Sequence, residues 1–164
     1  MTIVETTLSE HFLFPSTLFY ERTPHRVLTI LGSCVSVCLF DQELGFGGIN
    51  HYMLPWWTGT GTPSPKYGDV AIEKLIEKMI HNGSRKENLV AKVFGGANQH
   101  AFNQKLLDIG ARNISTAEKL LAAHKIKIIA QNTGGTKGRR LVFQSQTNQV
   151  LMKYLEPTEL KQAV

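Results

Sequence analysis

The fold is decided by residues 27–55, which read VLTILGSCVSVCLFDQELGFGGINHYMLP. The branched apolar run at residues 27–31 predicts a short buried strand, and Gly32 and Ser33 interrupt it. An apolar run with a period of two restarts at Val35, so a second strand follows at once. The stretch therefore predicts consecutive strands separated by a two-residue break.

The second of these strands predicts one arm of a hairpin. Residues 35–40 alternate in character, residues 41–45 supply turn chemistry, and residues 46–54 are extended again until Pro55. In a hairpin folded at this turn, residues whose numbers sum to about 85 face each other. We therefore expect Cys34 to lie directly across from His51.

Working outward, helical and extended patterns alternate along the rest of the chain. A helix is predicted from Asp69 as its cap to Asn82-Gly83, because its apolar positions recur at intervals of three and four residues. A second helix is predicted to start at Asn113 or Ser115. Further strands are predicted at residues 89–94 and 125–131, with a closing hairpin formed by 141–146 and 150–155. This order favours an α/β domain in which helices cover a mixed sheet.

Composition places the chain among globular proteins of one domain, residues 1–164. Hydrophobic residues make up 42%, charged residues 19%, and mean hydropathy is −0.12, which excludes disordered and fibrous classes. Two cysteines are too few for a disulfide scaffold, and the first ten residues lack the apolar core of a secretory signal. We expect a cytoplasmic protein without a membrane-spanning segment.

The net charge of +5 is concentrated in the second part of the chain, where residues 101–164 hold ten Lys and Arg against four Asp and Glu. This surplus suits an acidic partner or a solvated surface. Nucleic acid is not an expected partner, because the closing hairpin lacks interleaved basic and aromatic side chains.

A cysteine beside a histidine is a pattern for nucleophilic catalysis. An adjacent imidazole can lower the pKa of a thiol, and it can then protonate a departing amine. Gly32 and Ser33 would let main-chain N–H groups turn toward an oxyanion at Cys34. The alternative is a buried structural cysteine and a core histidine, and Cys38 is expected to be such a core thiol. No histidine pair has metal-ligand spacing, so we expect neither a metal nor another cofactor.

Several motifs resemble the CheD family of chemoreceptor glutamine deamidases. They read LGSCVSVCLFD at 31–41, GGINHYMLP at 47–55, YGDVAI at 67–72, KVFGGA at 92–97, IGARN at 109–113 and TGGTKGR at 133–139. The resemblance covers about residues 25–155. It implies a three-layer α/β/α sandwich related to the catalytic domain of cytotoxic necrotizing factor toxins.

The resemblance also implies an activity, the hydrolysis of selected receptor glutamines to glutamates with release of ammonia. Cys34 matches the family's nucleophile and His51 its base. A threonine that orients the base is expected five or six residues before the cysteine, and Thr29 is the candidate. On one uninterrupted strand, however, Thr29 and Cys34 would point to opposite faces, so only the break at Gly32-Ser33 could bring them together.

The resemblance implies partners as well, namely the cytoplasmic helices of chemotaxis receptors and, for some members, a CheC-type phosphatase. An alternative function is therefore a regulatory binding protein with little catalysis. For receptor binding we expect Trp56 and Trp57 to supply aromatic anchors, although both can instead pack on the domain. Arg139 and Arg140 are expected to meet acidic receptor side chains.

Overall fold

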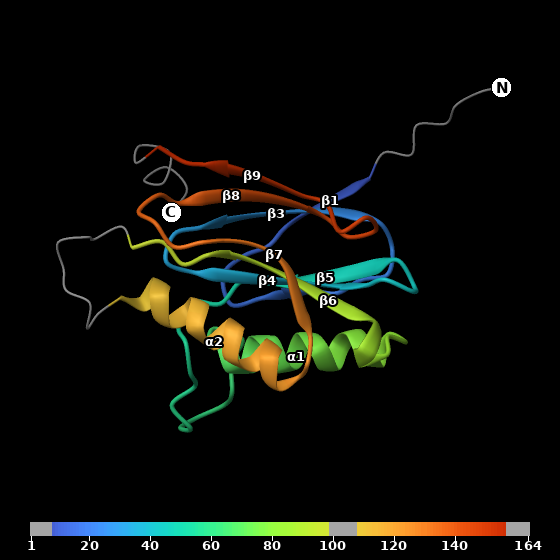
Figure 1. Ribbon diagram of the computed structural model, residues 1–164, viewed down its shortest axis with the longest axis horizontal. Coiled ribbons are helices and arrows are strands. Elements are labelled where there is room, and N and C mark those ends of the chain that lie inside the picture. The colour runs from blue at the N-terminus through green and yellow to red at the C-terminus, as the bar shows by residue number, and fades with distance from the viewer. Residues whose placement is uncertain (1–7, 99–107, 157–164) are drawn as a thin grey trace.

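The computed structural model describes residues 8–98 and 108–156, which form two sheets and two α-helices (Figure 1). A four-stranded sheet has the order β1-β3-β8-β9, and a five-stranded sheet has the order β2-β5-β4-β6-β7. The elements are β1 (Ser9–Phe12), β2 (Leu18–Phe19), β3 (His25–Leu31), β4 (Val35–Asp41), β5 (Phe46–Asn50), α1 (Gly68–His81), a 3-10 turn (Lys86–Asn88), β6 (Leu89–Gly95), α2 (Ile109–Ala123), β7 (Lys127–Thr133), β8 (Arg139–Gln144) and β9 (Val150–Tyr154).

The layers are stacked as helices, five-stranded sheet and four-stranded sheet (Figure 1). Helices α1 and α2 both pack on the five-stranded sheet and on each other. One apolar cluster lies between the helices and that sheet, and a second lies between the two sheets. The α/β class with a mixed sheet is confirmed. The α/β/α layer order is not what the described residues form, because a second sheet takes the place expected for the second helical layer.

Helix α1 forms because its apolar side chains share one face. Leu75, Ile76 and Met79 are buried against the five-stranded sheet. Its cap is Tyr67 instead of the expected Asp69, which lies in the first turn and binds the backbone N–H of Trp57 at 2.9 Å. An acidic side chain there favours the positive end of the helix dipole.

Helix α2 begins earlier than the sequence predicted. Asp108 is its cap, accepting a hydrogen bond from the N–H of Ala111 at 2.9 Å. The expected start residue Asn113 is therefore a buried residue inside the first turns of the helix. This difference places the Asn113 side chain against the segments that carry Cys34 and His51.

The hairpin of β4 and β5 is present, but its register differs from the prediction. Asp41 pairs with Phe46, Cys38 pairs with Ile49, and an isolated bridge joins Val35 and Tyr52, so paired numbers sum to 87. The side chain of Asp41 accepts two N–H bonds within the turn, both at 2.8 Å. The loop therefore has four residues, and its centre lies one residue beyond the expected position.

The break at Gly32-Ser33 carries the chain from one sheet to the other. Strand β3 belongs to the four-stranded sheet and β4 to the five-stranded sheet. The preceding segment also links the sheets, since β1 pairs with β3 and β2 pairs with β5. Inner faces of both sheets consequently meet at the start of β4.

Candidate active site

Cys34 lies in the turn between β3 and β4, where hydrogen bonds from the rest of the protein hold three successive carbonyls. The carbonyl of Gly32 accepts from the N–H of Ala97 at 3.0 Å, and that of Cys34 accepts from the N–H of Gly96 at 2.9 Å. The carbonyl of Ser33 accepts from the side-chain amide of Asn113 at 2.9 Å. The nucleophile candidate therefore sits on a fixed loop.

These contacts also fix the direction of the N–H groups, because the C=O and N–H of one trans peptide point in opposite directions. With the carbonyls of Gly32 and Ser33 bound by the protein, the N–H groups of Ser33 and Cys34 point away from those contacts. The N–H of Cys34 lies close enough to its own sulfur to lower the pKa of the thiol, although desolvation by burial has the larger and opposite effect. This arrangement suits the oxyanion site expected at Gly32 and Ser33.

His51 follows β5 and is held by Thr29 of the opposite sheet. Thr29 Oγ1 lies 2.7 Å from His51 Nδ1 and 2.8 Å from the carbonyl oxygen of Leu13. A carbonyl can only accept, so the threonine hydroxyl donates to Leu13 and must accept the Nδ1 proton of His51. The imidazole is thereby held as the tautomer whose Nε2 is unprotonated.

Nε2 of His51 is buried and has no hydrogen-bond partner among the residues that the structure describes. A buried nitrogen without a hydrogen bond destabilises the folded state, and a catalytic role explains why a protein keeps one. The lone pair of this nitrogen is therefore available to accept a proton from a nearby thiol.

The observed register makes Cys34 and His51 diagonal neighbours instead of a direct pair. Each precedes one member of the Val35–Tyr52 bridge, whose side chains belong to the helix-side core. Because side chains alternate, Cys34 and His51 both face the four-stranded sheet. Diagonal neighbours have Cβ atoms roughly 7–8 Å apart or somewhat less, compared with ~4.5–5.5 Å for direct pairs.

Thr29 reaches His51 because the two strands lie in different sheets. Val27, Thr29 and Leu31 are the buried positions of β3 and point toward the five-stranded sheet. On one continuous strand, Thr29 and Cys34 would point to opposite faces. The chain instead changes sheets at residues 32–33, so this restriction does not apply. The three candidate residues thus meet between the sheets, with His51 and Thr29 buried and Cys34 half-buried.

Burial keeps the resting pair neutral. It raises the pKa of the Cys34 thiol to about 11 and lowers the pKa of His51 to about 4. This differs from the expected lowering of the thiol pKa by the imidazole, because desolvation penalises both charged forms. The geometry fits proton transfer during attack, in which neutral His51 takes the thiol proton.

Cys38 provides an internal comparison. It is fully buried in the cluster between the sheets, and burial raises its pKa strongly. The prediction of a core thiol at this position is confirmed.

Asn113 and the N-terminal segment are parts of the site that the sequence did not predict. The side-chain amide of Asn113 donates to the carbonyls of Ser33 and Met53, at 2.9 and 3.0 Å, and so joins the loop of Cys34 to the segment that contains His51. In the N-terminal segment, the N–H of Ser16 donates to the carbonyl of His51 at 2.8 Å. The quoted IGARN motif was the available signal for Asn113, whereas β1 and β2 are too short to show a periodicity.

Arg139 was expected to contact the receptor, but its side chain points into the protein and cannot do so. It is buried, and its guanidinium donates to the side chain of Asn132 at 2.7 Å and to the carbonyls of Gly134 and Gly95, at 2.6 and 3.4 Å. It therefore holds the glycine-rich loop against the segment whose next residue, Gly96, binds the carbonyl of Cys34. Arg140 points to the opposite face and is exposed.

The two tryptophans lie in the loop between β5 and α1, which extends past the helical layer away from the four-stranded sheet (Figure 1). Trp56 is 45% exposed. Trp57 is half-buried, and its indole N–H donates to the carbonyl of Thr60 in the same loop at 3.2 Å. Trp56 is thus the more accessible of the two for a partner.

No helix in the described ranges is both long and apolar enough to cross a membrane. Within the same ranges, no group of three or more His, Cys, Asp and Glu side chains could hold a metal ion.

Comparison with known proteins finds one family model, described as CheD chemotactic sensory transduction, that matches residues 53–154. A relative from Sulfurimonas denitrificans, named probable chemoreceptor glutamine deamidase CheD, is 44% identical over 149 residues, covering 90% of this chain and 96% of its own length. Relatives of the same name from Trichlorobacter lovleyi and Clostridium botulinum are 44% and 40% identical; they cover 88% and 80% of this chain and 90% and 84% of their own lengths. A match over 90% of the chain necessarily includes residues 29–51.

Proposed function

The chain belongs to the CheD family, and from this premise we propose that it is a chemoreceptor glutamine deamidase, a hydrolase of protein glutamine side chains. Its proposed substrates are glutamines of methyl-accepting chemotaxis receptors, which it converts to glutamates with release of ammonia. The observation that carries the mechanism is the Thr29–His51 hydrogen bond, which leaves Nε2 free to accept a proton.

The proposed reaction begins when the Cys34 sulfur attacks the amide carbon and its proton passes to Nε2 of His51. The carbonyl oxygen becomes an oxyanion beside the N–H groups of Ser33 and Cys34. The imidazolium then returns the proton to the amide nitrogen, and the C–N bond breaks to release ammonia. The product of this half-reaction is a thioester between Cys34 and the receptor side chain.

Water completes the cycle. His51 accepts one proton from the attacking water while the hydroxide oxygen adds to the thioester carbon. The C–S bond breaks, the proton returns to the Cys34 sulfur, and a receptor glutamate is released. Thr29 keeps the imidazole in the same orientation for both half-reactions.

The proposed setting is the cytoplasm, where the receptor helices would be accessible. A CheC-type phosphatase is proposed as a further partner, on the resemblance alone. The alternative of a binding protein with little catalysis is disfavoured because Cys34, His51 and Thr29 are all present in one arrangement.

The deciding experiment measures ammonia release and a one-dalton mass gain on a receptor cytoplasmic fragment. We expect activity in the wild type, none in Cys34→Ser, and retained activity in Cys38→Ser, whose thiol lies in the core. A wild type that binds the fragment but releases no ammonia would support the binding-protein alternative. Equal loss in both cysteine variants would contradict the assignment of Cys34 as nucleophile.

A further inference from the structure

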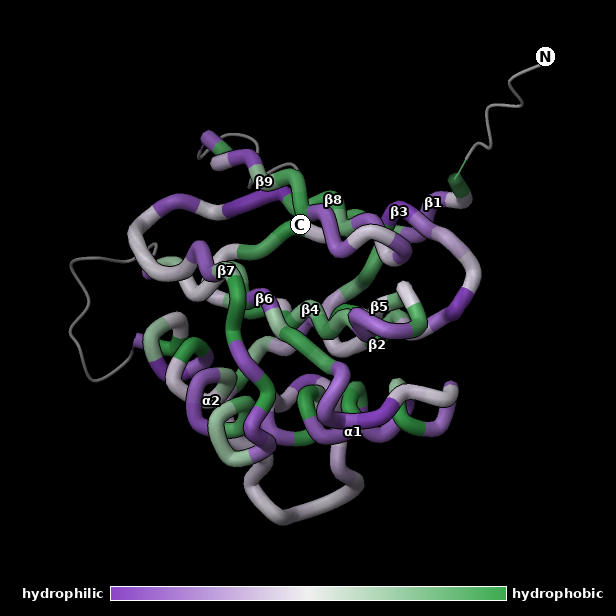
Figure 2. The backbone as a smooth tube through the Cα atoms, turned by 45° about the vertical axis from the view of Figure 1, so that its right-hand side comes forward, coloured by the Kyte–Doolittle hydropathy of each residue, from purple (hydrophilic) through white to green (hydrophobic). Residues whose placement is uncertain are grey.

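The outer face of the four-stranded sheet, which neither helix covers within the described ranges, carries a band of apolar side chains. On β3 the inward residues are Val27, Thr29 and Leu31, so Leu28 and Ile30 point outward. Among the described residues, the helices lie on the other side of the molecule (Figure 2). An antiparallel sheet normally carries polar side chains on a solvated face.

The outward apolar side chains form one row across all four strands. The strand register aligns Phe12 with Leu28, Leu28 with Val142, and Val142 with Leu151. Phe12 is 46% exposed and Leu151 is 50% exposed. A continuous apolar row of this kind is typical of an interaction surface.

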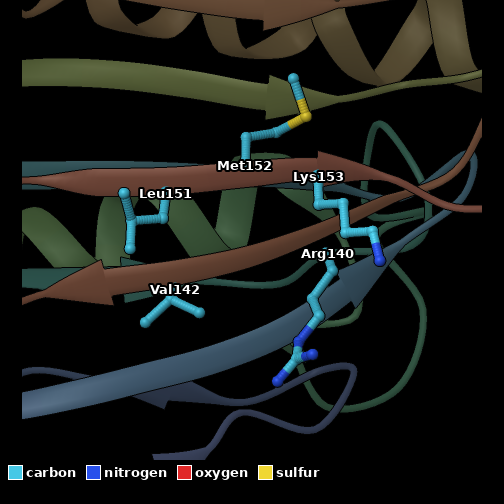
Figure 3. Close-up of a pocket in the computed structure, with 5 residues that line it drawn as sticks. All are labelled: Arg140, Val142, Leu151, Met152 and Lys153. Carbon is cyan, nitrogen blue, oxygen red and sulfur yellow. The ribbon is translucent and has the colours of Figure 1, made fainter.

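A cationic row lies next to the apolar row. The register aligns Ile30, Arg140 and Lys153, and both charged side chains are exposed. Neither forms an ion pair within the described part of the chain. Figure 3 shows both cations beside the open hollow that Val142 and Leu151 help to line.

This cationic row lies at the catalytic end of the sheet. Leu31 pairs with Arg139 in the final row of β3, and Cys34 follows three residues later. The four Cα–Cα steps from Ile30 to Cys34 span at most about 14 Å of chain. A segment bound on the outer face can therefore extend around the rim toward the catalytic loop.

We propose that this outer face, comprising the apolar row and the cationic row, docks an acidic amphipathic helix of the receptor substrate. The proposal rests on the proposed function and adds the surface that selects the receptor. The apolar row matches the apolar side of such a helix, and Arg140 and Lys153 match its carboxylates. A second copy of this chain would offer these cations only one carboxylate from the strands of this sheet, Glu10, which already lies 3.7 Å from Arg26. A phosphate backbone offers nothing to the apolar row.

The test compares a receptor cytoplasmic fragment with a short peptide that contains one of its glutamines. Arg140→Glu/Lys153→Glu is expected to lower kcat/KM for the fragment about tenfold or more and to flatten its salt dependence. Peptide hydrolysis should stay within about twofold of wild type, because the substitutions lie outside the dyad. Leu151→Ser is expected to weaken fragment turnover with the salt dependence retained.

The matched control is Lys119→Glu/Lys127→Glu, which makes the same charge change at exposed positions on α2 and β7. It should leave both substrates unaffected. Arg140→Gln/Lys153→Gln guards against misfolding caused by two facing glutamates, and it should show a smaller loss of the same selectivity.

Binding of the fragment to the Cys34→Ser protein separates the two proposals. If the wild type releases no ammonia while the outer-face variants still weaken fragment binding, the proposed function fails and the docking surface stands. If the wild type is active and the variants change fragment and peptide equally or not at all, the docking surface is refuted. Binding of anionic lipid vesicles at Arg140 and Lys153, with unchanged fragment binding, would also refute it.

Discussion

Thr29→Val is the sharpest perturbation of the proposed site, because it exchanges a hydroxyl for a methyl group of similar size. Thr29 is fully buried, and its hydroxyl makes the two hydrogen bonds to His51 Nδ1 and the carbonyl of Leu13, at 2.7 and 2.8 Å. The substitution leaves one buried donor and one buried acceptor without a partner. It also removes the group that selects the imidazole tautomer.

The substitution should lower both the free energy of unfolding and kcat, and the size of each effect can be worked out separately. Each of the two buried polar groups left unpaired costs about 1–3 kcal/mol, so we expect the free energy of unfolding to fall by roughly 2–6 kcal/mol. Loss of the tautomer preference and orientation should cost about 1.4–2.7 kcal/mol in the transition state, which corresponds to a 10- to 100-fold lower kcat.

The assay combines the rate of ammonia release with nitrogen NMR of the His51 ring. Thr29→Ser keeps the hydroxyl and should retain the Nδ1–H tautomer and most of the activity, whereas Thr29→Val should lose both. Wild-type kcat and an unchanged tautomer in Thr29→Val would refute the reasoning. So would an equal loss in both variants, because the hydroxyl would then be irrelevant.

Further predictions address the dyad and its surroundings. Iodoacetamide should label half-buried Cys34 faster than fully buried Cys38, as peptide mass mapping would show, and His51→Ala should slow the reaction at Cys34 by removing its proton acceptor. Burial lowers the pKa of His51 to about 4 from its ordinary 6.5, so kcat/KM should fall as the pH drops through about 4. Because unfolded His51 binds its proton near pH 6.5 and folded His51 only near pH 4, the free energy of unfolding should fall by about 3 kcal/mol as the pH drops from 6.5 to 4. Denaturant titrations of wild type and His51→Ala at several pH values would measure this difference. Arg139→Lys should lower kcat about tenfold with little change in KM for a short peptide, because a lysine cannot reproduce the branched contacts that hold the glycine-rich loop; steady-state kinetics would detect an unchanged kcat as a contradiction. Asn113→Ala should lower kcat and destabilise the fold by about 1–3 kcal/mol in thermal unfolding, since two backbone carbonyls lose their donor.

The sequence was most informative where periodicity and turn chemistry are local. Helix α1 and the β4–β5 hairpin were predictable from residue spacing, and the nearness of Cys34 and His51 followed from the hairpin. The two-residue register difference came from the Asp41 turn, in which side-chain hydrogen bonds and Gly45, with φ of 71°, make the loop four residues long. Local composition does not distinguish such a loop from one centred a residue earlier.

The remaining differences depend on tertiary structure. Nothing local in Gly32-Ser33 shows that the chain changes sheets there, and this change decides whether Thr29 faces Cys34. Arg139 and Arg140 looked alike as a basic loop, but β8 begins at Arg139, so alternation buries the first and exposes the second. Charge alone could not assign one arginine to the interior and the other to a surface.

Because the chain crosses between the sheets at residues 32–33, the proposed catalytic activity depends on both sheets staying packed together. Cys34 directly precedes β4 and His51 directly follows β5, both strands of the five-stranded sheet, but the hydroxyl that orients His51 belongs to β3 of the four-stranded sheet. A partial opening that detaches the four-stranded sheet would remove the hydrogen bond that orients the His51 imidazole, while the five-stranded sheet and its helices stay folded. Activity should therefore vanish together with amide-exchange protection in β3 and β8, at a lower denaturant concentration than the loss of protection in β4 and β6.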